Sequence, residues 1–284
     1  MTFQERLTLM CSIDKAKTYK MNFVDEDDLK VIKYVSKVLD TFKMEPATVK
    51  NRMTLNEAKI ESIKLLELFG GDIASRAESL LNKTSILEVH PLPFIYSCNT
   101  KFDLDQNDEV LKNSGRFLDV KVPSVMDTSA PVLLGHECIH LLKETNYEEY
   151  VDAFVYSDVI PLFFELVKMN DVESPKVLFA ERMHLLLTDK FNFDEYTRRI
   201  EYNDFDKELY EYSQTRAGEY LNSFYYAIVL FKMYKENKED ILNYIKLVLN
   251  HKITTRELLS ILGIYKNMDC RDIFESEFNK VRSI

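Results

Sequence analysis

The residues of this sequence best suited to chemistry lie in the pentapeptide HECIH at positions 136–140. Its spacing is H-E-x-x-H, within an apolar run that has the character of a buried helix. Helical residues four apart lie on one face, about 40° from each other, so His136 and His140 can both reach one tetrahedral Zn²⁺. Glu137 would flank that ion and take a proton from a zinc-bound water as general base. The motif predicts one zinc ion per chain.

A third metal ligand is expected among the acidic residues that follow this motif in apolar sequence. Glu165 stands inside the strongly apolar segment YVDAFVYSDVIPLFFELVKM at 150–169. An unpaired carboxylate buried there would be costly, so Glu165 should meet a cation or point out of the core. A zinc ion held by two imidazoles is one candidate cation. Exposure to solvent or pairing with Lys168 is the alternative.

Helices must supply most of the framework around these residues. Residues 25–44 and 54–83 carry apolar positions at helical spacing, and Thr54 with Glu57 reads as a capping box. The pair Gly70-Gly71 predicts a break or kink. After 174 the sequence predicts further helices, near 175–190, 194–203, 206–236, 238–250 and 255–263. We expect an N-terminal helical region over 1–85 and a continuous catalytic core over 86–284.

Two short segments break the helical pattern. SILEVHPLPFIYS, near 86–97, and RFLDVKV, near 115–122, are rich in strand-forming residues and bounded by turn residues. We expect them to form a small antiparallel sheet close to the metal. Such an edge can hold an extended peptide by main-chain hydrogen bonds.

Composition narrows the function classes. The 284 residues carry a net charge of −10 with bases and acids intermixed, which argues against a nucleic-acid partner. The N-terminal run contains charges, unlike a signal peptide, and no apolar stretch is long enough to span a membrane. Four cysteines without C-x-x-C pairing are typical of reduced thiols. These features predict a cytoplasmic protein without a membrane partner; they leave its oligomeric state open.

The segments GHECIH, FVYSDVIPLFFE and SFYYAIVLFKMYKEN together resemble the catalytic core of the thimet oligopeptidase and oligoendopeptidase F family, helical zinc peptidases of the gluzincin type. The resemblance covers about 130–264. It implies a mainly α, zincin-type core and a third ligand about 25 residues after the second histidine. Glu165 is 25 residues after His140, so the resemblance favours Glu165 as that ligand.

The resemblance also implies a tyrosine that hydrogen-bonds the oxyanion. The F-Y-x-Y-like stretch is matched by residues 224–226, and Tyr225 is the residue carried over, with Tyr226 and Tyr220 as the next candidates. The family's helper histidine has no counterpart, because residues 214–222 contain none.

Two functions follow as hypotheses. The first is a zinc-dependent metallopeptidase that hydrolyses short peptides, with Glu137 as base and Tyr225 as oxyanion donor. The second is a catalytically inactive peptide-binding or regulatory protein on the same scaffold, which the missing histidine favours. The presence of Glu137 favours catalysis, since a purely structural zinc site has no use for a base there.

Overall fold

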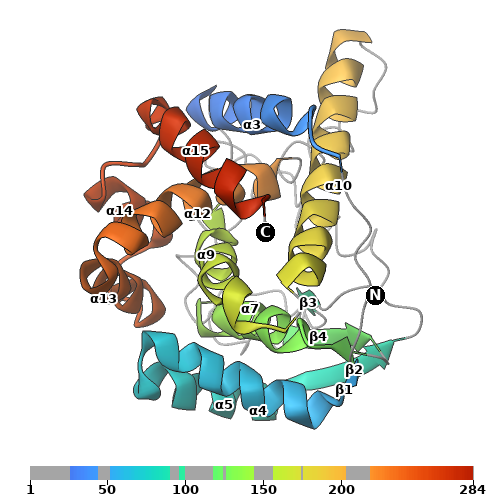
Figure 1. The fold of residues 1–284 in the computed structure, drawn as a ribbon, viewed down its shortest axis with the longest axis vertical. Helices are drawn as coiled ribbons and strands as arrows, with labels where there is room; N and C mark the ends of the chain where they lie inside the picture. Colours follow the sequence, from blue (N-terminus) through green and yellow to red (C-terminus); the bar gives the residue numbers. More distant parts are fainter. Residues whose placement is uncertain are drawn as a thin grey trace, which may run out of the picture.

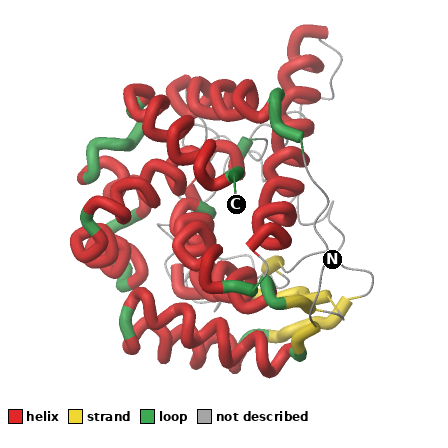
Figure 2. The backbone as a smooth tube through the Cα atoms, viewed as in Figure 1, coloured by secondary structure: helices red, strands yellow, loops and turns green. Residues whose placement is uncertain are grey.

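The computed structural model describes residues 26–43, 52–89, 96–99, 118–123, 126–143, 156–173, 175–202 and 218–283. These residues are mainly helical, as predicted (Figure 2). The helices are α3 (Glu26–Leu39), α4 (Leu55–Leu66), α5 (Gly71–Lys83), α7 (Ala130–Lys143), α9 (Val159–Lys168), α10 (Pro175–Tyr202), α12 (Glu219–Glu236), α13 (Lys238–Leu249), α14 (Thr255–Ile261) and α15 (Arg271–Val281). Short 3₁₀ turns occupy Glu67–Phe69, Met169–Asp171 and Met268–Cys270. No helix in the described ranges is long and apolar enough to cross a membrane.

Local sequence signals account for several helix boundaries. Thr54 caps α4 by accepting from the backbone N–H of Glu57, whose carboxylate accepts from the backbone N–H of Thr54. The predicted break lies at Gly70, whose φ of 113° is open to glycine and strained for other residues. The break predicted between 190 and 194 is absent, because α10 continues through it to Tyr202. Residues 203–217, within the helix predicted for 206–236, lie outside the described ranges.

The strands form two small sheets. Strands β1 (Arg52–Met53) and β5 (Met126–Asp127) pair antiparallel. Strands β2 (Ser85–Val89), β4 (Leu118–Pro123) and β3 (Tyr96–Asn99) form a second sheet in the order β2-β4-β3.

The second sheet is mixed rather than purely antiparallel as we expected. Strand β2 runs parallel to β4, with Ile86 opposite Val120, whereas β3 runs antiparallel to β4, with Ser97 opposite the same valine. Strand composition does not encode direction, which depends on the connections between strands. Strand β3 of this sheet lies against α7, the helix that carries His136 and His140.

Helix α7 lies at the centre of the packing. Helices α4 and α5 cover one side of α7. Helix α9 also packs against α7, and α12 packs against α9 (Figure 1). Helix α3 packs on α12, so elements from the predicted N-terminal region contact those of the predicted core. All residues of α7 except His140 are buried, which explains why its sequence is apolar on nearly every face.

The close approach of α7 and α9 depends on Gly135. A Cβ atom at this position would lie 2.6 Å from Cε1 of Phe164, closer than carbon atoms pack. The glycine therefore lets the two helices bring their polar residues together.

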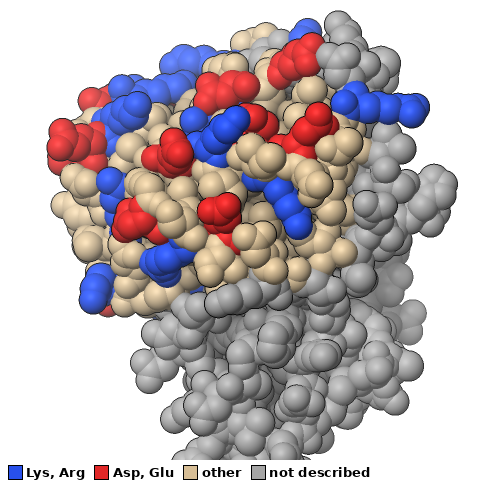
Figure 3. Space-filling model, turned by 90° about the horizontal axis from the view of Figure 1, so that it is seen from below, with Lys and Arg blue, Asp and Glu red and all other residues tan. Residues whose placement is uncertain are grey.

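The outer face of α4 and α5 is charged. Viewed from below the molecule, acidic and basic side chains are intermixed over the described part of this face (Figure 3). Exposed pairs such as Lys64 with Glu61, 2.6 Å apart, contribute little stability.

Candidate metal centre

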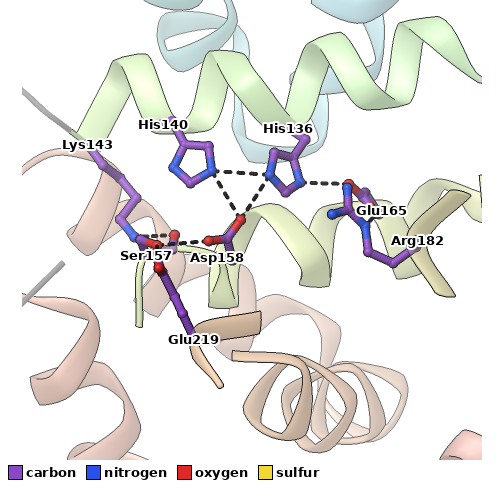
Figure 4. Close-up of polar contacts among 8 residues, drawn as sticks. All are labelled: His136, His140, Lys143, Ser157, Asp158, Glu165, Arg182 and Glu219. Carbon is purple, nitrogen blue, oxygen red and sulfur yellow. Dashed lines mark hydrogen bonds and ion pairs between the residues drawn. The ribbon is translucent and has the colours of Figure 1, made fainter. Parts of the chain in front are cut away.

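Helix α7 brings the two motif histidines together. The Nε2 atoms of His136 and His140 lie 3.1 Å apart, and both side chains point to the same side of the helix (Figure 4). His136 is buried, whereas the side chain of His140 is 14% exposed. The predicted use of one helical face by the two imidazoles is therefore confirmed.

Asp158, immediately before α9, completes a triangle of donor atoms. Its Oδ1 lies 3.1 Å from Nε2 of His136 and 3.3 Å from Nε2 of His140. Zinc ligands at 2.0–2.1 Å in a tetrahedral arrangement are separated by about 3.3 Å. Within the described ranges, these three residues form the group able to hold a metal ion. Two imidazoles and a carboxylate are a donor set that suits zinc.

Neighbouring residues hold Asp158 in this position. The Ser157 hydroxyl lies 2.8 Å from Oδ2 of Asp158 and 2.8 Å from Oε1 of Glu219, so its single proton serves one carboxylate at a time. The Nζ of Lys143 donates to the Ser157 carbonyl over 2.9 Å. Burial alone would raise the pKa of Asp158, but the two histidines hold that pKa well below its usual range. Asp158 is therefore an anion, as a metal ligand must be.

Glu165 does not join this triangle. Its Oε1 lies 2.6 Å from Nδ1 of His136, on the ring edge facing away from His140 and Asp158 (Figure 4). Its carboxylate also accepts two hydrogen bonds from Arg182, one of them from Nε over 2.8 Å. The structure thus places Asp158 where we expected Glu165, and it places Glu165 on the opposite side of the His136 ring.

Opposing charges set the protonation of this group. Burial would lower the pKa of His136, but Glu165 and Asp158 outweigh it and raise the pKa to about 9. Burial would raise the pKa of Glu165, but Arg182 and His136 lower it. A metal ion at Nε2 would have to displace a proton from His136, so its binding is coupled to pH.

Tyr225 lies elsewhere in the fold. Its hydroxyl donates to the backbone carbonyl of Asn267 over 2.9 Å, and its ring packs against Tyr34 and Phe274. The hydroxyl of Tyr226 accepts from the backbone N–H of Lys266 over 3.1 Å. Both hydroxyls are therefore bound to backbone atoms of residues 266–267 rather than to the donor triangle of His136, His140 and Asp158.

Tyr220 is the tyrosine of α12 that lies beside the site. The Arg182 guanidinium is 5.8 Å from the centre of its ring. The carboxylate of Asp158, followed by burial, raises the pKa of Tyr220 well above its usual value, and Glu137 adds to the effect. Tyr225 lies five positions after Tyr220, which turns the two side chains about 140° apart on a helix.

Glu137 and the N-terminus of α12 are the remaining parts of the fold that bear on the candidate site. Glu137 is buried on α7, one residue after His136. Asp189 accepts from the backbone N–H groups of Gly218 and Leu221 over 2.9 and 3.1 Å, which fixes the end of α12 that carries Tyr220. Helix α10 thus contributes both Arg182 and Asp189 to the arrangement.

Known proteins add nothing to this description. Comparisons with protein-family models, curated proteins and solved structures find no match.

Proposed function

We propose that this protein is a zinc-dependent metallopeptidase, with His136, His140 and Asp158 as the metal ligands. The observation that carries the proposal is the triangle of donor atoms, whose edges of 3.1 to 3.3 Å match those of a zinc tetrahedron. Glu137, adjacent to a ligand on the same helix, adds the base that a structural zinc site would not need. The resemblance to thimet oligopeptidase and oligoendopeptidase F supports the same reaction.

The residues of the site divide the work of peptide hydrolysis. When bound, Zn²⁺ would supply a Lewis acid that polarises a carbonyl and acidifies a water. Glu137 takes the proton of the attacking water and passes it to the leaving amine. Tyr220 donates its hydroxyl proton in a hydrogen bond to the carbonyl oxygen as negative charge develops there. Its raised pKa favours the protonated phenol that this role requires.

Strand β3 supports a short, extended peptide as substrate. It is at one edge of the described three-stranded sheet and lies against α7. An extended peptide can pair with such an edge through main-chain hydrogen bonds. Peptide binding there would place a scissile bond alongside the helix that carries Glu137.

The test compares wild-type protein with Glu137→Gln on a quenched-fluorescent peptide library, after zinc loading and measurement of the metal content of both. Glutamine keeps the side-chain size but cannot accept the proton. We expect zinc in both proteins and a fall in hydrolysis of about 10² to 10⁴-fold in the variant. Equal trace hydrolysis by the two zinc-loaded proteins would instead support the peptide-binding alternative.

A further inference from the structure

Three buried side chains from three helices form a continuous polar chain behind the metal-binding triangle. Arg182 of α10 donates from Nε and Nη2 to the two carboxylate oxygens of Glu165 on α9. Oε1 of Glu165 lies 2.6 Å from Nδ1 of His136 on α7. The side chains of Arg182, Glu165 and His136 are 8%, 2% and 2% exposed.

The contact at Nδ1 decides what His136 can offer at its other nitrogen. A carboxylate at Nδ1 holds a proton there, so the lone pair of Nε2 is available to a metal. The contact also restrains the ring, because turning the imidazole over would carry Nδ1 away from the Glu165 carboxylate, 2.6 Å from it. In this orientation Nε2 faces His140 and Asp158.

Arg182 in turn fixes Glu165. A guanidinium binds both oxygens of a carboxylate in one plane, which a lysine ammonium cannot do. Both oxygens of Glu165 are bound by Arg182, so the carboxylate has one orientation, and that orientation directs Oε1 at His136. The ring of Tyr220 lies 5.8 Å from the guanidinium carbon and limits its movement from the side of α12.

We propose that Arg182 is a positioning residue of the metal centre, which acts through Glu165 to present Nε2 of His136 to the metal. This inference rests on the proposed function, because it presupposes that the triangle binds a divalent ion. It assigns Arg182 a role in metal affinity beyond its contribution to folding. Arg182 is not one of the three donor residues, and it reaches His136 through its hydrogen bonds to Glu165.

The test measures the affinity of metal-free protein for Co²⁺, followed by its visible absorption, and for Zn²⁺ by competition. Arg182→Lys keeps the charge that pairs with Glu165 but loses the planar fork. We expect affinity to fall about 10- to 100-fold, as for other outer partners of metal-binding histidines, with an altered Co²⁺ spectrum. Glu277→Gln is the matched control, because Glu277 is a buried carboxylate of α15 paired with Lys235 and Lys280 away from the centre.

A double variant guards against loss of folding. Arg182→Met with Glu165→Met removes both charges, so that no single buried charge is left unpaired. We expect it to retain the helical circular dichroism of the wild type, with Co²⁺ affinity reduced at least as much as in Arg182→Lys. Wild-type affinity and spectrum in either folded variant would overturn the positioning role. Failure of the wild-type protein to bind either ion would instead overturn the proposed metal centre.

Discussion

Asp158 and Glu165 show how two carboxylates near one histidine take different roles. Both contact His136, but at opposite ring nitrogens, with Oδ1 of Asp158 at Nε2 and Oε1 of Glu165 at Nδ1. Only Nε2 of His136 also lies close to Nε2 of His140. The carboxylate on that side can therefore share a metal with both histidines, whereas the other can only orient one of them.

The tyrosines of α12 allow a residue-level prediction with an internal control. Tyr220→Phe removes a hydroxyl beside the site, so we expect kcat for peptide hydrolysis to fall about 10² to 10³-fold with little change in KM. Tyr225→Phe removes the same atom from the same helix but at a hydroxyl bound to the Asn267 carbonyl. We expect it to alter stability slightly and kcat hardly at all. The reverse ranking in steady-state kinetics would exclude Tyr220 as the oxyanion donor.

The sequence identifies those site residues whose geometry is local. His136 and His140 share one helix, so their spacing alone predicts that their imidazoles meet. The third candidate ligand comes from another element, and nothing local distinguishes Asp158 from Glu165, since both are buried acids in one apolar segment. Arg182 is not identified from the sequence for the same reason, and Tyr220 is named there only as an alternative to Tyr225. Which face of α10 or α12 meets the site is decided by packing.

At the scale of elements, the spacing between α7 and α9 sets the distances between the donor atoms of His136, His140 and Asp158. Asp158 precedes α9, and the two histidines lie on α7, so any displacement of one helix changes the distances between donor atoms. At Gly135 of α7, an added Cβ atom would lie only 2.6 Å from the Phe164 side chain of α9, so this residue limits how closely the helices can pack.

Gly135→Ala tests this dependence. The added methyl group would clash with Phe164, so we expect destabilisation of about 1–3 kcal/mol in urea unfolding, together with weaker Zn²⁺ binding. Gly71→Ala is the control, because a Cβ at Gly71 would meet no atom within 4 Å and Gly71 begins α5. We expect the control to be neutral or slightly stabilising. Equal stability and zinc affinity in the two variants would mean that α7 and α9 tolerate a wider spacing.

The contact between α10 and the start of α7 predicts that the stability of the folded protein depends on pH. The Ser129 hydroxyl lies 3.1 Å from Oε2 of Glu181 and donates a hydrogen bond to the Asp127 carboxylate. Burial, with the Asp127 charge, raises the pKa of Glu181 to about 8. The folded protein therefore holds a proton that the unfolded chain releases near its ordinary pKa of 4.5. The stability that this proton contributes is complete below pH 4.5 and is lost as pH rises towards 8.

Glu181→Gln should remove this loss, because glutamine can bond to Ser129 without ionising. We expect the melting temperature of metal-free wild type to fall from pH 5 to pH 8 more steeply than that of the variant. Differential scanning calorimetry across this range gives the comparison. Parallel curves would show that Glu181 ionises in the folded protein as readily as in the unfolded chain.

For the whole molecule, a metal ion would act as a cross-link between α7 and the segment before α9. An ion that binds only the folded chain stabilises it by mass action, by about 2.7 kcal/mol at a concentration 100 times Kd. In a chain of 284 residues that corresponds to a rise in melting temperature of roughly 5 °C. We expect this rise on addition of Zn²⁺, its reversal by a chelator, and its loss in Asp158→Asn. An equal rise in Asp158→Asn would assign the stabilising ion to another site.

More of the fold than of the candidate site can be predicted from the sequence. The capping box at Thr54, the break at Gly70 and the periodicity of α3 are local signals, and the corresponding elements agree with the structure. The direction of β2 relative to β4 was not predicted correctly, because it depends on the chain between Val89 and Leu118. Local periodicity thus predicts elements, whereas their pairing and the partners of buried charges arise from tertiary packing.

The most direct test of the metal centre is anomalous diffraction at the zinc absorption edge from crystals of the zinc-loaded protein. We expect a single strong peak within about 2.0–2.2 Å of Nε2 of His136, Nε2 of His140 and an oxygen of Asp158. In the electron density of the same crystal, Glu165 should remain hydrogen-bonded to Arg182 and in contact with Nδ1 of His136. A crystal without a peak at these atoms, or one in which Glu165 replaces Asp158 as the ligand, would contradict this account.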